Sequence, residues 1–291
     1  MIRINFVEVG KIHSGVNIWS RKMMNFLPKD EFARKVSIDY ASEHEGNFDL
    51  VYYNFYRRVK KIKTPSVALF THIETYNSGM EQKFYNAANR VDHIIVISQL
   101  YKDILMKKGY AASKITVANL GCDLETFKPK IKLGIAAWKR ESGRKGEKCL
   151  SAFLEHTTIP LEYLKFIIVG REWENWVEKH EKLVDIDYRG KVEPEQVAEM
   201  MQEIDYYLCP SKYEGQCLPL MEAYACGKPI ISRLVGMVCN ELEEVTIFDS
   251  HYDLDVILNR LIMDKRKSVE QYTWENYAAK HIAVFRATAK K

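Results

Sequence analysis

The feature that most constrains the fold is the alternation of short apolar runs with helical stretches along the whole chain. The first series of runs lies near residues 2–7, 36–38, 51–53, 67–70, 94–97 and 115–118. Each run has about the length of a buried strand and none approaches the roughly 18 apolar residues that span a bilayer. Strands that alternate with helices predict an α/β fold with parallel sheets.

A second series of the same kind begins after Phe127-Lys128-Pro129. Its strands are expected near 131–136, 166–169, 205–208 and 229–232, and its helices near 145–155, 194–203 and 218–226. A length of 291 residues also favours two domains. We therefore predict two Rossmann-like domains, 1–127 and 128–275, that face each other across a cleft, with the site at the carboxyl ends of their strands.

Composition and the first residues predict a cytoplasmic protein. The chain is 47% apolar and 28% charged, as in ordinary globular proteins. Its N-terminus carries Arg3 and Glu8 within an apolar run, so we interpret it as a first strand and not as a signal peptide. The six cysteines form no Cys-Xaa-Xaa-Cys pair, and no His-Glu-Xaa-Xaa-His is present. Neither a zinc site nor a disulfide framework is expected.

The net charge of +4 comes from the first half of the chain. Part of the excess lies in residues 57–63, where five of seven side chains are cationic. A solvated loop is one interpretation of this basic run. The other is peripheral docking on an anionic membrane or on an acidic acceptor.

Residues 209–232 form the most informative stretch, in the order strand, loop, helix, strand. Pro219 suits a first helical turn, Gly227 suits the position after the last turn, and Pro229 blocks continuation. Free N–H groups of residues 216–219 at the helix start favour an anion such as phosphate. Glu214 and Glu222 flank this position and suit sugar or ribose hydroxyls. The same pattern also fits a capped helix with surface glutamates.

This stretch resembles the signature of GT-B glycosyltransferases of family four. It has the segment Pro-Ser-Xaa-Xaa-Glu-Gly, two glutamates with seven residues between them, and Glu-Ala-Xaa-Ala-Xaa-Gly-Xaa-Pro. Residues 94–127 are similar to the segment that closes the first domain of that family. Residues 272–277 resemble the start of its terminal helix, which implies that 276–291 packs back on the first domain. The resemblance implies retaining, metal-independent transfer from a nucleotide-diphosphate sugar.

The resemblance also implies roles for individual residues. Arg140 and Lys145 match a basic pair that holds the donor diphosphate, and His72 matches a histidine near the donor sugar. Glu214 then binds the sugar hydroxyls and Glu222 the ribose. The remaining donor-binding positions are Gly15 in the segment His13–Val16, Val192 in a loop that contacts the nucleobase, and Gln216, Cys217 and Leu218 at the helix start.

The chain departs from the family pattern at several positions. Gln216-Cys217 stands where the family has Phe-Gly, Gly236 keeps one residue of a Gly-Gly pair, and Lys139 replaces the glycine before Arg140. A side chain at 217 is expected to crowd the approach of phosphate or sugar that glycine permits. These departures motivate the alternative of a non-catalytic protein that binds nucleotide sugars.

A second alternative is a metal-dependent GT-A enzyme. Asp185-Ile-Asp187 and Asp253-Leu-Asp255 have the spacing with which such enzymes hold a divalent cation on the diphosphate. The preferred prediction has no cofactor and takes a UDP- or GDP-sugar as substrate. The acceptor, whether glycan, lipid or protein, and the oligomeric state stay open, and no nucleic acid is expected.

Overall fold

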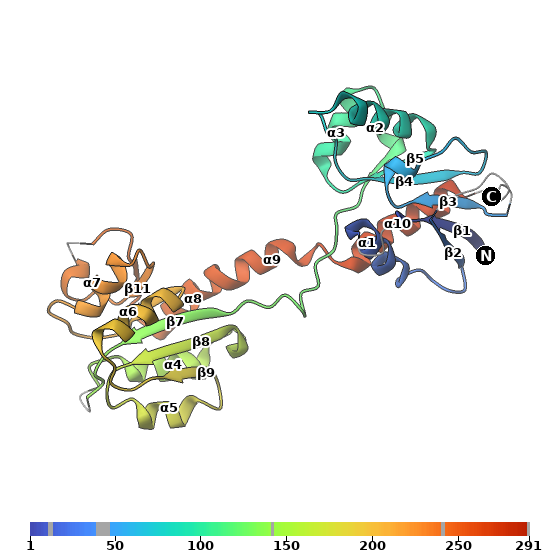
Figure 1. Ribbon diagram of the computed structural model, residues 1–291. Helices are drawn as coiled ribbons and strands as arrows, with labels where there is room; N and C mark the ends of the chain where they lie inside the picture. The colour runs from blue at the N-terminus through green and yellow to red at the C-terminus, as the bar shows by residue number, and fades with distance from the viewer. Residues whose placement is uncertain (11–13, 39–46, 141–142, 240–241, 290–291) are drawn as a thin grey trace. The chain divides into compact units, whose positions relative to one another are not determined.

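The chain consists of two compact units, each of which is described by itself. The computed structural model describes residues 1–10, 14–38, 47–140, 143–239 and 242–289. The first unit comprises Met1–Leu124 and Val269–Lys291, and the second comprises Glu125–Ser268 (Figure 1). The change of unit thus falls after Leu124, where the sequence placed it after residue 127. The predicted cleft stays a prediction.

The first unit is built on a parallel six-stranded sheet in the order β2-β1-β3-β4-β5-β6. The strands are β1 (Ile2–Val7), β2 (Phe32–Ser37), β3 (Leu50–Tyr53), β4 (Ser66–Phe70), β5 (His93–Val96) and β6 (Ile115–Val117). The helices are α1 (Gly15–Met24), α2 (Ser78–Arg90) and α3 (Gln99–Lys107), with 3₁₀ turns η2 (Tyr56–Arg58) and η3 (Ala112–Lys114). The predicted α/β class is confirmed.

Strand β2 was predicted poorly. It runs from Phe32 to Ser37, whereas the sequence indicated 36–38. It pairs only with β1 at the edge of the sheet, and its middle residues Arg34, Lys35 and Val36 are exposed. An edge strand with this much charge lacks the apolar run by which the other strands were found.

The last helix, α10 (Trp274–Thr288), belongs to the first unit and buries one face against its sheet. Phe285 lies edge-on to Phe6 and Tyr52, with ring centroids 6.0 and 5.3 Å apart. The helix begins at Trp274 because the Thr273 hydroxyl accepts a hydrogen bond from the Asn276 N–H at 3.1 Å. The predicted helix began at residue 276. The helix covers the face that α1 also covers, while α2 and α3 cover the other.

The second unit repeats this arrangement with the strand order β12-β11-β10-β7-β8-β9, again all parallel. The strands are β7 (Ile131–Ala136), β8 (Leu164–Val169), β9 (Asp185–Tyr188), β10 (Tyr206–Cys209), β11 (Ile230–Ser232) and β12 (Thr246–Ile247). The helices are α4 (Glu147–His156), α5 (Glu174–His180), α6 (Pro194–Glu203), α7 (Leu218–Ala225) and α8 (His251–Asn259), and α9 (Lys265–Glu270) continues into the first unit at Val269. Short turns η4 (Leu161–Tyr163), η5 (Gly236–Cys239) and η6 (Arg260–Asp264) complete the list.

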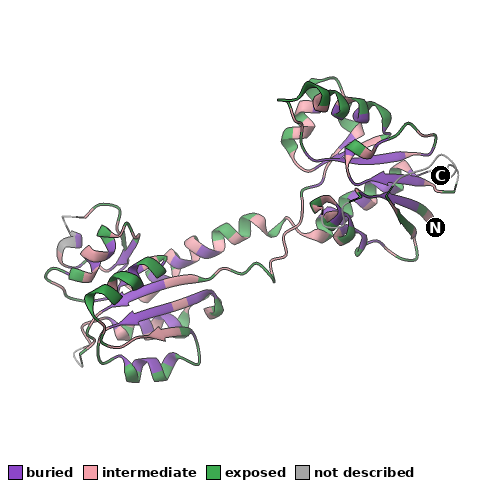
Figure 2. Cartoon of the chain, viewed as in Figure 1, coloured by how far each residue is buried: buried purple, intermediate pink, exposed green. Residues whose placement is uncertain are grey.

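Helices cover both faces of this second sheet. One core contains Leu150 of α4, Trp176 of α5 and Leu254 of α8, and the other contains Met200 of α6 and Leu220 of α7. The central strands β7, β8, β10 and β11 are mostly buried, as β7 and β8 show in Figure 2, whereas the edge strands β9 and β12 are intermediate or exposed. Burial on both faces is the reason that the central strands read as continuous apolar runs. In the part of the chain that is described, no helix is long and apolar enough to cross a membrane.

Candidate functional site

Two loops at the carboxyl ends of β7 and β10 are held against each other in the second unit. Gly146, the residue before α4, has a φ of 83°, and a Cβ at this position would lie 2.0 Å from the Pro210 carbonyl oxygen. Lys212 N–H donates a hydrogen bond to the Arg144 carbonyl at 2.8 Å. Only glycine permits both the left-handed backbone and the close approach. These contacts bring Lys145 and Glu214 together.

Lys145 and Glu214 form a largely buried ion pair. Their side chains are 13% and 10% exposed, and Lys145 Nζ donates a hydrogen bond to Glu214 Oε1. Burial raises the pKa of the Glu214 carboxyl, but hydrogen bonds from Lys145 and Ser211 outweigh it, so that the pKa is lowered. The carboxylate is therefore ionised at neutral pH. The sequence placed both residues in the site, but it gave no sign that they contact each other.

The N-terminus of α7 follows directly after this pair. Cys217 is its N-cap residue, and its carbonyl accepts the N–H groups of Leu220 and Met221. Pro219 has no N–H, so the prediction of free donors over 216–219 was too wide. The N–H groups of Gln216, Cys217 and Leu218 have no acceptor among the described residues. Such a helix start favours an anion.

The Cys217 side chain does not lie at the open helix start. It is 7% exposed and belongs to the core between the sheet and helices α6 and α7, with its Sγ 4.0 Å from Cys209 Sγ. The sequence had led us to expect a side chain that crowds the phosphate or sugar. Its burial removes the physical basis of that expectation.

A cavity of about 430 Å³ lies beside the helix start, at the carboxyl ends of β7 and β8. Three residues of the predicted donor site line it, namely Val192, Leu218 and Glu222. Trp138, Arg171 and Lys191 also line it. Lys191 belongs to the predicted nucleobase loop, whereas the sequence analysis had missed Trp138 and Arg171 as candidate site residues. The signal that was available is the position of Trp138, just after a buried strand and two residues before Arg140.

Arg140 lies over the exposed indole of Trp138. The distance from its guanidinium carbon to the ring centroid is 4.3 Å, and Arg171 lies 5.3 Å from the same centroid. Both contacts have the geometry of a cation–π interaction. The φ of Arg140 is 52°, which lies in the left-handed region. Trp138 thus connects the predicted diphosphate arginine with the cavity.

His72 and Gly15 belong to the first unit. His72 follows β4, its side chain is 53% exposed, and its Nε2 lies 3.4 Å from Glu74 Oε1. Gly15 is the first residue of α1, where a Cβ would make only an ordinary 3.5 Å contact with Trp19. The local backbone therefore does not require glycine at 15. His13 of the predicted glycine loop lies outside the described residues.

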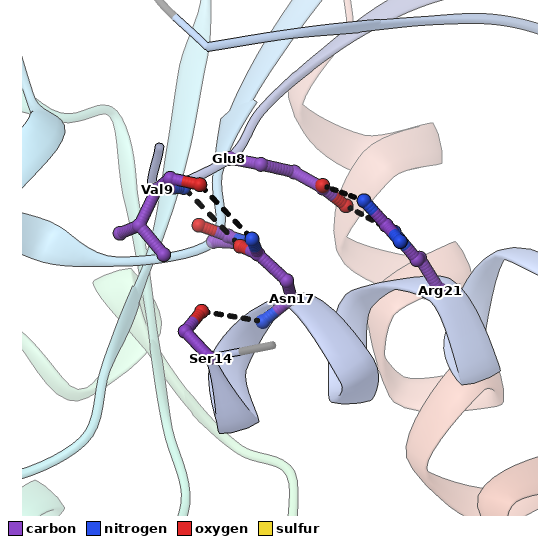
Figure 3. Close-up of polar contacts among 6 residues, drawn as sticks. Glu8, Val9, Ser14, Asn17 and Arg21 are labelled. Atoms are coloured by element: carbon purple, nitrogen blue, oxygen red, sulfur yellow. Dashed lines mark hydrogen bonds and ion pairs between the residues drawn. The ribbon is translucent and has the colours of Figure 1, made fainter. Parts of the chain in front are cut away.

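A buried polar network at the carboxyl end of β1 was not predicted. Glu8, which is 3% exposed, forms an ion pair with Arg21 of α1, with 2.9 Å between Glu8 Oε2 and Arg21 Nη2. Asn17 donates to the Val9 carbonyl at 2.9 Å and accepts from the Val9 N–H at 3.2 Å (Figure 3). The Asn54 amide donates to Asn17 Oδ1 at 2.7 Å. The Asn17 side chain bonds the N–H and the carbonyl of Val9, as a neighbouring strand would, and so fixes the start of the loop that precedes α1.

Both Asp-Xaa-Asp tripeptides have structural partners. Asp185 lies 3.1 Å from Lys130 Nζ, and Asp187 lies 2.7 Å from Arg189. Asp253 caps the start of α8 together with Ser250. Over the ranges that the structure describes, no group of three or more His, Cys, Asp or Glu side chains is placed to hold a metal ion.

Comparison with known proteins shows which proteins this chain is similar to. Residues 140–253 match the family model described as glycosyl transferases group 1. The O-antigen chain mannosyltransferase B of Escherichia coli is 23% identical over 283 residues, which cover 82% of this chain and 74% of that protein. The MMP alpha-(1->4)-mannosyltransferase of Mycolicibacterium hassiacum is 28% identical over 111 residues, 31% of this chain and 26% of that protein.

Among solved structures, Anabaena Alr3699/HepE in complex with UDP and glucose is 17% identical. The comparison covers 100% of this chain and 96% of that one, with a TM-score of 0.38. The family match includes the Lys145–Glu214 pair, the start of α7 and Glu222, all of which lie between residues 140 and 253. The likeness to the glycosyl transferases group 1 family thus lies in the second unit, in the part of the chain that contains these residues.

Proposed function

We propose that this chain is a retaining, metal-independent glycosyltransferase of the GT-B architecture, which moves a hexosyl group from a nucleoside-diphosphate donor to an acceptor hydroxyl. The observation that carries the proposal is the Lys145–Glu214 pair beside the N-terminus of α7 and next to the 430 Å³ cavity. A cation, free peptide N–H groups and a cavity in one unit are the parts that bind a nucleoside diphosphate.

The donor nucleoside is proposed to occupy the cavity. Val192 and Leu218 offer it apolar contacts, and Glu222 lines the same cavity with a carboxylate that accepts hydrogen bonds from the ribose hydroxyls. The diphosphate then lies at the start of α7, where the N–H groups of 216–218 point. Glu214 lies next to this position and is proposed to bind the hydroxyls of the transferred sugar.

Catalysis is proposed to be mainly electrostatic. Negative charge grows on the leaving diphosphate, and Lys145, Arg140 and the helix N-terminus offset it as preorganised positive charge. Lys145 has three N–H donors, so that it can keep its bond to Glu214 while it donates to the diphosphate. His72 is proposed to orient the donor sugar. The leaving phosphate oxygen takes the acceptor's proton, and no protein nucleophile is assigned.

The names of the relatives guide the choice of donors. Two of the similar proteins are called mannosyltransferases, and one similar structure contains UDP and glucose. We therefore propose UDP- and GDP-linked hexoses as the first donors to test. Asp185, Asp187 and Asp253 are engaged in ion pairs and a helix cap, which supports the metal-independent proposal over the metal-dependent alternative.

The test is a thermal-shift screen of the protein against nucleotide sugars in EDTA. A ligand that binds the folded state raises the melting temperature. At a ligand concentration one hundred times its Kd, the free energy of unfolding rises by about 2.7 kcal/mol. Transfer or donor hydrolysis in EDTA supports the proposed enzyme. Binding without turnover on any acceptor supports the non-catalytic alternative, and no response to any nucleotide refutes both.

A variant makes the test specific to the cavity. Glu222→Ala is expected to weaken nucleotide binding by about 1 to 3 kcal/mol, because charged hydrogen bonds to the ribose are lost. Glu199→Ala is the matched control, since Glu199 is an exposed glutamate of α6 that does not line the cavity. Calorimetry with UDP and GDP measures both. Equal affinities for Glu222→Ala and the control would contradict the assignment of Glu222.

We also propose a cytoplasmic location, with peripheral contact at an anionic membrane through the basic run. Lys60, Lys61 and Lys63 of that run are exposed. These lysines are the side chains proposed to meet the lipid headgroups. The energy of such contacts is about 1 kcal/mol for each lysine near the surface.

A further inference from the structure

Two cysteines bracket the loop that carries Glu214. Cys209 is the last residue of β10, and Cys217 is the N-cap of α7. Their sulfur atoms are 4.0 Å apart, and the side chains are 2% and 7% exposed. A disulfide bond needs a sulfur–sulfur distance of about 2.05 Å, so that a movement of about 2 Å separates the two thiols from a bond.

From this geometry we propose that Cys209 and Cys217 are a covalent modification site, a dithiol that peroxides or small disulfides convert to an intramolecular disulfide. The bond closes residues 210–216 into a small loop. That loop contains Ser211 and Glu214. The contact between Glu214 and Lys145 depends on the position of the loop. In the oxidised chain the loop that carries Glu214 thus takes a second position, which differs from the one in the reduced chain.

The reaction needs one thiolate that attacks and one thiol that resolves, and the two cysteines differ accordingly in exposure and in thiol pKa. Cys217 is the more exposed, and it lies at a helix N-terminus, where positive potential favours a thiolate. The hydrogen bond from the Cys209 thiol lowers the pKa of Cys217, and the Leu220 N–H adds to this effect. The same pairing raises the pKa of Cys209. Cys217 is therefore the attacking sulfur, and Cys209 is the resolving one.

The reaction with hydrogen peroxide balances as follows. The Cys217 thiolate attacks one peroxide oxygen, the O–O bond breaks, and a sulfenic acid and hydroxide result; the hydroxide takes the proton that the Cys217 thiol had lost. Cys209 sulfur then attacks Cys217 sulfur, the S–O bond breaks, and water leaves with the Cys209 proton. The two sulfur atoms lose two electrons in total, and the peroxide is reduced to two water molecules.

The sequence offers a direct assay, because trypsin cleaves after Lys212, inside the loop. Cys209 then lies in the peptide 192–212, and Cys217 and Cys226 lie in the peptide 213–233, since Pro229 protects the bond after Lys228. Treatment of the full folded chain with hydrogen peroxide or oxidised glutathione, followed by digestion without reductant, is expected to link these two peptides. The link should disappear on reduction.

Variants separate this pair from the other thiols. Cys217→Ala and Cys209→Ser are expected to abolish the link, whereas the matched control Cys226→Ser, at the other end of α7, is expected to keep it. Loss of the link in Cys226→Ser, or oxidation of the wild type without any link between 192–212 and 213–233, would overturn the proposal. The wild-type assay decides the matter even where a variant fails to fold.

The effect on the loop is measured with UDP and GDP, and this part rests on the proposed function. Oxidised wild type is expected to lose most of its thermal shift with the nucleotide, while oxidised Cys209→Ser keeps it. An unchanged shift in linked wild type would refute a second state of the Glu214 loop. A reduced protein that shows no shift at all would instead refute the proposed function and leave the peptide link as the test of the dithiol.

Discussion

Substitution of Gly146 by alanine is the sharpest test of how the site is assembled. Gly146 joins the loop of Lys145 to α4, has a φ of 83°, and lies against the Pro210 carbonyl. Alanine here meets two separate costs. One is the left-handed backbone conformation, and the other is a Cβ that would stand 2.0 Å from a backbone oxygen.

The magnitude follows from adding these costs. A non-glycine residue in the left-handed region costs about 1 to 2 kcal/mol. An overpacked methyl that forces the backbone to move adds about 1 to 3 kcal/mol. Gly146→Ala is therefore expected to lower the free energy of unfolding by about 2 to 5 kcal/mol. The forced shift also separates Lys145 from Glu214, because Pro210 and Glu214 belong to one loop.

Gly227→Ala is the matched control. Gly227 has a φ of 66°, and a Cβ there would meet nothing within 4 Å, so that only the backbone cost of about 1 to 2 kcal/mol applies. Urea unfolding is followed by tryptophan fluorescence, to which Trp173 and Trp176, buried in the same unit, contribute. Equal loss of stability in the two variants would refute the close approach of Gly146 to Pro210 as the constraint.

Three further predictions concern charge. The lowered pKa of Glu214 means that its carboxylate stabilises the fold above the ordinary value of 4.5, and that this contribution is lost as the pH falls through the lower, folded-state pKa. Glu214→Gln should therefore lower the urea midpoint most near neutral pH and least in acid; a deficit that does not change with pH would contradict this. Arg140→Ala should lower kcat more than donor affinity, as kinetics and calorimetry can compare, and equal losses would argue against a role at the departing diphosphate. Lys60→Glu with Lys61→Glu should abolish sedimentation with anionic liposomes at low salt, and wild-type binding that persists at high salt would exclude an electrostatic contact.

Periodicity in the sequence was sufficient to predict most of the framework. The strands β1 and β7 and the helix α6 lie where the apolar runs indicated them. These elements are buried on both faces or begin at a proline, and both features are local in sequence. Strand β2 was misplaced because an edge strand with exposed charge has no such run. Its position is set by pairing with β1, a contact between distant residues.

The individual residues of the candidate site were predicted through the family pattern, but their arrangement was not. The Lys145–Glu214 contact joins residues 69 positions apart and depends on the backbone conformation of one glycine. The inward direction of Cys217 likewise follows from packing against β10, and Trp138 reaches the cavity because β7 ends beside β8. Local patterns determine which segments form strands and helices, since hydrophobic periodicity needs only neighbours in sequence. The tertiary structure alone decided which charges and thiols meet, because those distances depend on the register and connection of strands far apart in the chain.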